Sequence, residues 1–356
     1  MNLKKLVFGA LFSVVFFTSC SDDDDTIVET PIGAYDNGVL ILNQGGFGKG
    51  NASLSYLSVD SNTFQNNIFA LVNPTIILGD TGQDVGFYNE FAYIVMNGSN
   101  KIEIVNRYTM AHVATISTGL SNPRYIVFYN GKGYVSNWGN GSSTSDDYIA
   151  VINLSNNTLS APIPVMEGPE QMAIANGKLY VAHLGGLGVG STVSIINLST
   201  NGISSLSVGD APNSLEISGE TLYVLSGGKP SWTGSETAGK LSKINLSNDT
   251  VSGTIDFALT SHPSNLEISN SDLFYTVDSD VFKTLVNTST LPTTALFSTT
   301  AQGVYGVYSF EVQNEKIYIG DAVDYSSDGK IYVYSSTGNL EISKTVGVVP
   351  AGFYFN

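Results

Sequence analysis

Short runs in which apolar and polar residues alternate, separated by clusters of turn-forming residues, extend along most of this chain and predict β-strands. The clearest stretch extends from Ser121 to Pro162 and contains four such runs. Asn130-Gly131, between the first two runs, supplies the positive φ angles that a tight hairpin turn needs. Residues 155–158 are a second turn signal, between the third run and the fourth. The stretch therefore predicts a unit of four antiparallel strands.

This four-strand unit is repeated along the chain. Its first run opens with a step that reads Pro-x-x-apolar, and Gly82 and Val307 replace the proline in two copies. The step residues lie 41 to 51 residues apart, at positions 82, 123, 169, 212, 263, 307 and 350. The second run is also repeated, most clearly as Tyr134-Val, Tyr180-Val and Tyr223-Val. A period in the forties with four strands per unit is typical of a β-propeller.

The two ends of the repeat predict how the ring closes. The first copy, from Asn37 to about Asn73, lacks a first strand. The chain finishes with Pro350-Ala-Gly-Phe-Tyr-Phe-Asn, which is a first strand with nothing after it. Placing that strand in the first copy completes it and covers a sheet edge that could otherwise template aggregation. We therefore predict an all-β fold: a seven-bladed β-propeller over residues 37–356, with the C-terminal strand closing the first blade.

The first twenty residues have the pattern of a bacterial lipoprotein precursor. Lys4 and Lys5 precede an apolar stretch from Leu6 to Phe17, which is too short to be a permanent membrane-spanning helix. Small residues then precede Cys20, the only cysteine of the chain. This arrangement resembles the lipobox of bacterial lipoproteins, whose cysteine is lipidated and becomes the first mature residue. The alternative is an ordinary secretory signal, which would leave a lone cysteine in an exported protein unexplained.

The chain is therefore predicted to comprise a signal peptide at 1–19, a lipidated Cys20 with an acidic tether at 20–36, and the propeller. Four consecutive aspartates at 22–25 either form a solvated spacer or act as an address. As an address, they resemble the acidic run that sends some lipoproteins of Gram-negative bacteria to the outer leaflet. We expect a lipid-anchored outer-membrane protein that is exposed at the cell surface.

The charge of the chain excludes one class of partner. The sequence has 15 Lys and Arg against 31 Asp and Glu, which gives a formal net charge of −16. Nucleic-acid binding draws most of its affinity from cationic side chains on phosphates. Because the sequence has no basic cluster, we expect no nucleic-acid partner.

In a propeller, the loops between second and third strands share one face with the loops that lead into each first strand, and ligands usually bind there. The longest such loops, 137–147 and 226–236, each contain one of the two tryptophans. Packing of these tryptophans on blade edges is the structural alternative to ligand contact. The predicted ligand-binding residues are Gln44, Phe47, Asp84, Arg124, Tyr125, Asn137, Trp138, Gln171, His183, Trp232, Tyr308, Asp321 and Tyr325.

Candidate catalytic and metal-binding residues are few. Of the three histidines, only His183 is placed for the ligand face, and the spacing of histidines and carboxylates predicts no convergent metal site. Asp278, Asp280, Asp321 and Asp324 could hold a calcium ion, although carboxylates in turns more often form the turns themselves. We therefore expect no cofactor and no catalytic residue.

The second-strand sequences Tyr134-Val-Ser-Asn, Tyr180-Val-Ala-His and Tyr223-Val-Leu-Ser resemble the Tyr-Val-Thr-Asn repeat of the YncE-like propellers. The resemblance covers residues 37–356. With the lipobox and the acidic run, the chain resembles the YncE-like surface lipoproteins that work beside TonB-dependent transporters. Among these, the BtuG-like proteins capture cobalamin at the cell surface and pass it to the transporter. The resemblance implies a small-molecule ligand, cobalamin first, and a TonB-dependent transporter as partner.

Three functions remain open from the sequence. The first is non-enzymatic capture of a small nutrient, with cobalamin or another corrinoid favoured, because aromatic and amide-rich loops suit a large, mostly neutral ligand. The second is a lyase of the streptogramin-inactivating propeller type. That enzyme would need a catalytic histidine with a metal-holding carboxylate, for which His183 and Glu170 are the candidate pair. The third is a scaffold that binds a partner protein.

Overall fold

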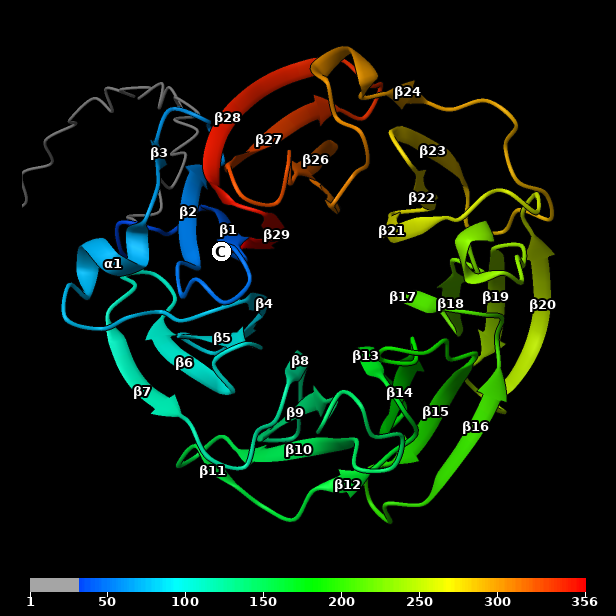
Figure 1. Cartoon of the computed structure of the whole chain (residues 1–356), viewed down its shortest axis with the longest axis horizontal. Coiled ribbons are helices and arrows are strands. Elements are labelled where there is room, and N and C mark those ends of the chain that lie inside the picture. Colours follow the sequence, from blue (N-terminus) through cyan, green and yellow to red (C-terminus); the bar gives the residue numbers. More distant parts are fainter. Residues whose placement is uncertain (1–31) are drawn as a thin grey trace, which may run out of the picture. The chain divides into compact units, whose positions relative to one another are not determined.

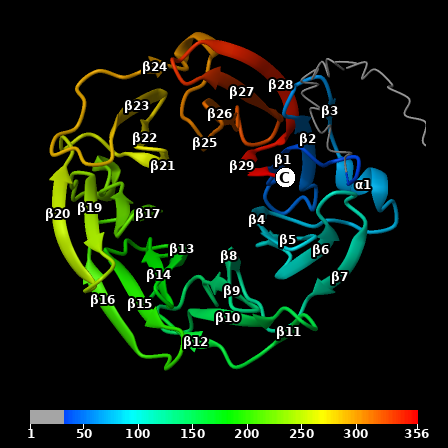
Figure 2. The same cartoon turned by 180° about the vertical axis from the view of Figure 1, so that it is seen from behind.

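Antiparallel strands are the main regular structure of residues 32–356, the part of the chain that this computed structural model describes. The strands form seven sheets, arranged around a central axis as the blades of a propeller (Figures 1 and 2). The helical elements among these residues are α1 (Ile68–Val72) and two 3-10 turns, η1 (Ser231–Thr233) and η2 (Thr300–Gln302). No helix in this range is long and apolar enough to cross a membrane. The predicted seven-bladed fold is confirmed.

The strands of each blade follow one another from the axis outward. Blade 1 contains β29 (Pro350–Phe355), β1 (Gly38–Asn43), β2 (Ser53–Ser58) and β3 (Phe64–Gln65). Blade 2 contains β4 (Gly82–Tyr88), β5 (Phe91–Met96), β6 (Lys101–Asn106) and β7 (His112–Ile116). Blade 3 contains β8 (Pro123–Tyr129), β9 (Lys132–Asn137), β10 (Tyr148–Asn153) and an interrupted fourth strand, β11 (Thr158–Leu159) with β12 (Ile163–Pro164).

The other four blades follow the same plan. Blade 4 contains β13 (Pro169–Ala175), β14 (Lys178–His183), β15 (Thr192–Asn197) and β16 (Ile203–Ser207). Blade 5 contains β17 (Pro212–Ser218), β18 (Thr221–Ser226), β19 (Lys240–Asn245) and β20 (Thr250–Asp256). Blade 6 contains β21 (Ser264–Ser269), β22 (Asp272–Val277), β23 (Asp280–Leu285) and β24 (Phe297–Ser298). Blade 7 contains β25 (Ser309–Gln313), β26 (Lys316–Asp321), β27 (Asp328–Ser335) and β28 (Leu340–Val348).

The turns form where the sequence places residues that tolerate positive φ. Asn130 and Gly131 have φ angles of 49° and 71°, as the predicted hairpin between β8 and β9 requires. At the end of β10, the side chain of Asn153 accepts the N–H of Ser155 at 3.0 Å. Asn197 and Asn245 cap the turns after β15 and β19 in the same way. The repeated Asn-Leu-Ser sequence is therefore explained by turn formation.

The repeated tyrosine of the second strand joins neighbouring blades. Tyr93, which is 1% exposed, packs 5.2 Å from the ring of Phe128 in the next blade. Its hydroxyl donates to Asn157 of that blade at 3.0 Å. Tyr180 likewise donates to Asp249 at 2.7 Å. The tyrosine thus combines a large buried ring with a satisfied polar end, which accounts for its repetition along the chain.

Blade 1 closes the ring with strands from both ends of the propeller. β29 pairs antiparallel with β1, with Ile41 opposite Phe353. The last residue, Asn356, binds the C-terminal strand to two other segments: its side-chain amide donates to the carbonyls of Tyr35 at 2.7 Å and Arg107 at 2.6 Å. Tyr35 itself is 5% exposed, so the end of the predicted tether packs on the propeller. Residues 1–31, with the predicted signal peptide and Cys20, lie outside the described residues.

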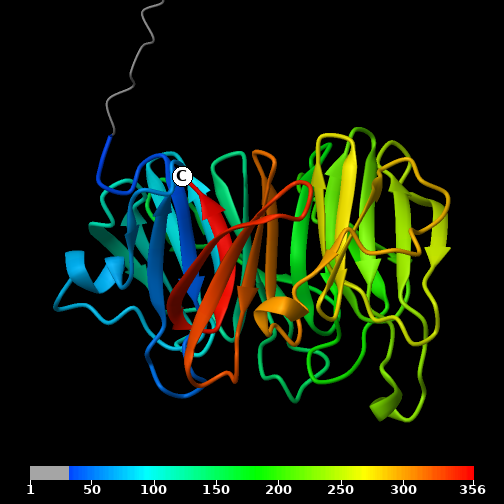
Figure 3. The ribbon, with the colours of Figure 1, turned by 90° about the horizontal axis from the view of Figure 1, so that it is seen from above.

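The direction of the strands gives the propeller two distinct faces. All innermost strands begin at one face, which we call the mouth face, and the β1–β2 and β18–β19 loops project from it (Figure 3). The C-terminus lies at the opposite face, the rear face (Figure 3). The described chain also starts at the rear face, because the backbone N–H of Tyr35 donates to Tyr108 in the β6–β7 turn. The predicted ligand loops therefore share the mouth face.

Closure by β29 predicts that its packing contributes strongly to stability. Phe353 is 4% exposed and packs against Val39, Ile41 and Val333. We expect Phe353→Ala to lower the free energy of unfolding by about 3–5 kcal/mol, because the substitution leaves a cavity between blades 1 and 7. The measurement is urea-induced unfolding. The matched control is Tyr305→Ala, since Tyr305 is 95% exposed, and an equal loss in both variants would contradict this account of closure.

Candidate functional site

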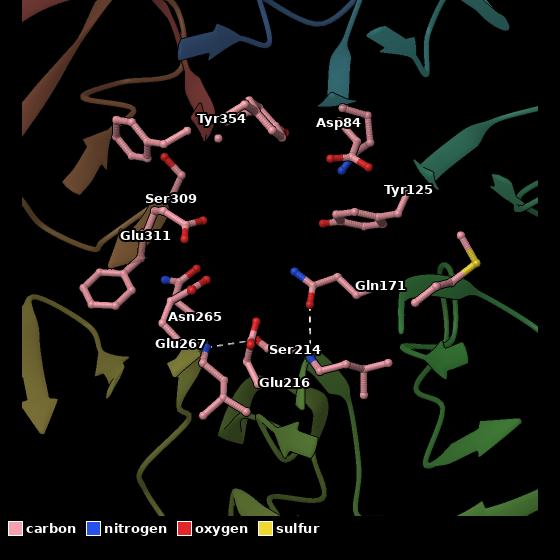
Figure 4. Close-up of a pocket in the computed structure, with 18 of the residues that line it drawn as sticks. Asp84, Tyr125, Gln171, Ser214, Glu216, Asn265, Glu267, Ser309, Glu311 and Tyr354 are labelled. Carbon is pink, nitrogen blue, oxygen red and sulfur yellow. Dashed lines mark hydrogen bonds between the residues drawn. The ribbon is translucent and has the colours of Figure 1, made fainter. Parts of the chain in front are cut away.

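The seven inner strands surround a cavity of ≈ 330 Å³ on the axis of the propeller (Figure 4). Two rings of side chains form its wall, because alternate residues of a strand point the same way. The first ring takes one residue from each inner strand, two positions after the residue that opens the repeat (82, 123, 169, 212, 263, 307 or 350). Its members are Asp84, Tyr125, Gln171, Ser214, Asn265, Ser309 and Gly352. The second ring lies four residues after each step residue and contributes Val127, Glu216, Glu267, Glu311 and Tyr354 to the wall.

A repeated backbone hydrogen bond fixes the mouth end of the inner strand in five blades. The residue before the step has a left-handed backbone in five blades: Thr81, Asn122, Gly168, Ala211 and Val349 have φ between 48° and 64°. In each case the carbonyl of this residue accepts an N–H from the same blade. The donor is the residue directly after the strand that pairs with the inner strand, which in blade 1 is β1. Through these bonds the backbones of Gln44 and Trp138 are fixed at 2.7 Å and 3.1 Å from Val349 and Asn122. Two predicted ligand-binding residues therefore sit on a rigid rim.

Side chains of the first ring satisfy backbone groups of the next blade. Six inner strands contain a bulge just after the step, where one extra residue leaves the ladder. Asp84 accepts the freed N–H of Ile126 at 2.8 Å, and Gln171 accepts that of Leu215 at 3.1 Å. Burial raises the pKa of Asp84 to about 6, while the N–H of Ile126 and the hydroxyl of Tyr354 oppose the shift. These polar residues thus have a structural role beside any contact with a ligand.

The second ring contains three glutamates from neighbouring blades, Glu216, Glu267 and Glu311, which all point into the cavity (Figure 4). Burial and the charge of Glu311 raise the pKa of Glu216 to about 8. Burial raises the pKa of Glu311 to about 7. Burial, with the charges of its two neighbours, holds the pKa of Glu267 well above its usual range. Sequence reasoning missed these residues, although glutamate stands at the same place in three successive repeats.

At the mouth, Arg124 forms the best-defined polar contact of the site. Its guanidinium binds the Glu170 carboxylate through two bonds, of 2.9 Å and 3.3 Å. The guanidinium also stacks over Trp138, 4.3 Å from the ring centroid. The Trp138 indole N–H lies near the Glu170 carboxylate and favours its charged form, but it makes no hydrogen bond of good geometry within the described residues. Arg124 and Trp138, both predicted, thus belong to one cluster, in which Arg124 is neutralised by Glu170.

A second aromatic cluster lies on the blade 7 side of the mouth. Tyr308 lines the cavity, and its hydroxyl donates to Gln44 at 2.5 Å. The ring of Tyr325 packs edge-on against Tyr308, with centroids 5.7 Å apart. The structure therefore brings three predicted residues from opposite ends of the sequence together at one point of the rim.

The remaining predicted residues divide into buried and exposed groups. Asn137, His183 and Asp321 are 0%, 1% and 7% exposed. Asn137 bonds to the backbone of Ser121 and Val135, and Asp321 accepts the N–H of Val323. Their placement gives them structural partners and does not support the ligand contact predicted for them.

His183, which the lyase alternative would need as its catalytic histidine, is held by structural contacts. Its ring nitrogens contact the Glu167 carbonyl at 3.2 Å and the Ser194 hydroxyl at 2.8 Å. Burial lowers its pKa to about 4. Glu170, its proposed partner, instead binds Arg124. By contrast, Phe47 and Trp232 are 86% and 84% exposed on mouth loops, so Trp232 does not pack as a cap on a blade edge.

The three cavity glutamates predict an unusual dependence of stability on pH. Their folded-state pKa values are raised above the value of about 4.3 expected in the unfolded chain. Their contribution to stability is therefore full below about pH 4.3 and is lost as pH rises through about 7–8. We compare the free energy of unfolding of the triple variant Glu216→Gln/Glu267→Gln/Glu311→Gln with that of wild type. The difference should shift in favour of the variant by on the order of a few kcal/mol when the pH is raised from 5 to 8.5.

The measurement is chemical unfolding at both pH values. A suitable control is Glu90→Gln/Glu220→Gln/Glu315→Gln, which removes the same charge from three exposed hairpin turns. Buried His183 also makes stability depend on pH, but this effect is the same in wild type and in both triple variants. It therefore cancels when each variant is compared with wild type. If the cavity variant and the turn variant respond equally to pH, the glutamates do not titrate as described.

Several solved structures with low sequence identity to this chain have a similar fold. A quinonprotein alcohol dehydrogenase-like protein from Bacteroides thetaiotaomicron has 14% identity and a TM-score of 0.68, over 90% of this chain and 78% of that chain. A functionally unknown protein from Desulfotomaculum acetoxidans has 14% identity and a TM-score of 0.64, over 90% of this chain and 99% of that chain. BamB from Moraxella catarrhalis has 13% identity and a TM-score of 0.52, over 88% of this chain and 84% of that chain. At these identities the likeness shows the fold alone.

Comparison of sequences gives the family. No curated protein matches the chain significantly. Residues 37–355 match the family described as Domain of unknown function (DUF5074). This range coincides almost completely with the repeats from which the propeller was predicted. The chain therefore belongs to the DUF5074 family.

Proposed function

We propose that this chain is a non-enzymatic binding protein that captures a small nutrient on its mouth face, with cobalamin or another corrinoid as the favoured ligand. The observation that supports this proposal most directly is the composition of that face. Its loops expose large apolar side chains in a chain with few charges: Tyr305 is 95% exposed, Phe47 86%, Trp232 84%, Leu187 78% and Tyr325 61%. Exposure of many large apolar side chains on one face usually marks a binding surface.

The rigidity of the rim also favours binding. The left-handed backbone residues before the inner strands fix the positions of Gln44 and Trp138, and Tyr308 is fixed by its bond to Gln44. A pre-organised surface loses little conformational entropy when it binds a ligand. Aromatic rings and amides in such positions suit a large neutral ligand through stacking and hydrogen bonds.

The size of the cavity indicates how a corrinoid would bind. A volume of ≈ 330 Å³ is at the low end for ligand sites and is too small for a corrin macrocycle with its side groups. We therefore place the macrocycle across the mouth face, against Trp138 and Trp232, with the cavity beneath it. The two tryptophans lie on blades 3 and 5, on either side of blade 4.

The two faces suit attachment to a membrane. The described chain starts at the rear face, so a lipid on Cys20 would anchor that side and leave the mouth face free. In this proposal the protein is an outer-membrane lipoprotein exposed at the cell surface, which passes its ligand to a TonB-dependent transporter. Exposed apolar side chains on the mouth loops would also serve for contact with that transporter.

The alternative of a lyase has less support. It needs a histidine and a carboxylate that act together on a substrate, whereas His183 is buried and Glu170 is paired with Arg124. No group of three or more His, Cys, Asp or Glu side chains within residues 32–356 is arranged to hold a metal ion.

Calorimetric titration of residues 21–356 with cyanocobalamin tests this proposal. We expect saturable binding, and a loss of affinity of about tenfold for Trp138→Ala or Trp232→Ala, because each ring contributes on the order of 1 kcal/mol through stacking. Tyr129→Ala is the matched control, since Tyr129 is an exposed aromatic residue at the rear end of β8. Absence of binding by the wild-type protein would reject cobalamin as the ligand, and equal losses in all three variants would reject the mouth face as the site.

A further inference from the structure

The three glutamates of the second ring differ from the other buried glutamates of the described chain. Glu103 is 1% exposed and contacts Lys101 at 2.5 Å and His112 at 2.9 Å. Glu170 is 3% exposed and contacts Arg124 at 2.9 Å. Within residues 32–356, no ion pair involves Glu216, Glu267 or Glu311. Glu267 and Glu311 hydrogen-bond to each other, but none of the three has a cationic partner. A partly buried carboxylate without a cation costs stability, so structure alone does not account for three such groups in one cavity.

The cavity between them has the size of a ligand and lacks a cation of its own. Its volume is ≈ 330 Å³, and no Lys, Arg or His of the described chain lines it. At the level of the glutamates, the rest of the wall is formed by Val127 and Tyr354, which carry no charge. The free space is therefore bounded by carboxylates on one side and by uncharged side chains on the other.

The groups that face the glutamates are neutral or weakly acidic. These groups are Asp84 from β4, Tyr125 from β8, Tyr354 from β29 and Tyr308, which directly precedes β25. Asp84 already accepts an N–H and the Tyr354 hydroxyl. Gln171, Asn265 and Ser309 add amide and hydroxyl groups above the carboxylates. This set offers hydrogen bonds to hydroxyl groups and, lower down, negative charge for a cation.

A bare metal ion fits this wall poorly. The three glutamates are not arranged as a ligand set for a metal within the described chain. An organic cation is larger, and its N–H groups can reach separate carboxylates through charge-assisted hydrogen bonds. A ligand with both an ammonium group and hydroxyl groups would match both rings.

From this arrangement we infer that the cavity is a binding site for a small polyhydroxylated amine in its ammonium form, which enters from the mouth and pairs with Glu216, Glu267 and Glu311. The site lies beneath the rim and shares Tyr308 with it, but neither Trp138 nor Trp232 lines the cavity. The inference therefore does not depend on the proposed capture of a corrinoid.

Binding at this site is coupled to release of protons. In the empty cavity, Glu216 and Glu311 have pKa values raised to about 8 and about 7, so they retain protons near neutral pH. An ammonium group favours the charged carboxylates, and the displaced protons pass to the solvent. The affinity for such a cation must then rise with pH as long as the amine stays protonated.

Titration calorimetry with N-methylglucamine tests the inference, with sorbitol as the neutral probe of similar shape. The secondary amine remains charged at pH 8, as alkylammonium groups do. We expect N-methylglucamine to bind at pH 8 at least tenfold more tightly than sorbitol, and about tenfold more weakly at pH 6 than at pH 8. Heats measured in phosphate and in Tris at the same pH should differ, because protons are released to the buffer.

Two variants separate the site from general attraction to an acidic protein. Glu216→Gln/Glu267→Gln/Glu311→Gln should lose binding by at least tenfold, whereas Glu90→Gln/Glu220→Gln/Glu315→Gln, with the same net charge, should bind like wild type. Equal binding of the two probes, no binding of N-methylglucamine, or equal binding by both variants would each overturn the inference. Because Trp138 and Trp232 are unchanged in all these proteins, the outcome is independent of the cobalamin titration.

Discussion

The hydrogen bonding of the bulged inner strands is the constraint on which the rest of this propeller depends. Each bulge frees backbone groups at the narrowest part of the ring, where water cannot satisfy all of them. Side chains of the preceding blade take over this role, as when Asp84 accepts the N–H of Ile126 and Asn213 donates to the carbonyl of Pro263 at 2.9 Å. The blades are thus joined by specific bonds as well as by apolar packing, and several side chains of the first ring contribute to these bonds.

This division of roles explains where binding chemistry is free to vary. First-ring residues such as Asp84, Gln171 and Ser214 cannot be exchanged freely, since removal of each side chain would leave a backbone N–H without its partner. The second ring and the mouth loops lack that obligation. Three glutamates without a cationic partner occupy the second ring, and exposed aromatic residues such as Trp232 occupy the loops. Both features cost stability or solubility, which is usual for residues kept for function.

The sequence predicts the fold well because each blade is specified by short sequence patterns that occur within one repeat. Turn residues such as Asn130-Gly131 and the repeated second-strand tyrosine mark each blade, and the unpaired last strand from Pro350 indicates closure. The site was predicted less completely. Arg124, Trp138 and Tyr308 were found because loops and strand starts gather at one face, but the burial of His183 depends on packing between blades that spacing does not reveal. The cavity glutamates lie within inner strands and not in loops, so the loop pattern does not indicate them, although their common place in three repeats is visible in the sequence.

The central claim is that the channel of this propeller holds three glutamate carboxyl groups without a cationic partner, and that burial raises their pKa values. Direct titration of glutamate side-chain carboxyl signals by carbon-13 NMR tests it, with Glu216→Gln, Glu267→Gln and Glu311→Gln used for assignment. The account predicts carboxyl groups that titrate near pH 7–8, and loss of these signals in the single variants. If every glutamate titrates near its ordinary pKa of about 4.3, the cavity is open to water and the account is wrong.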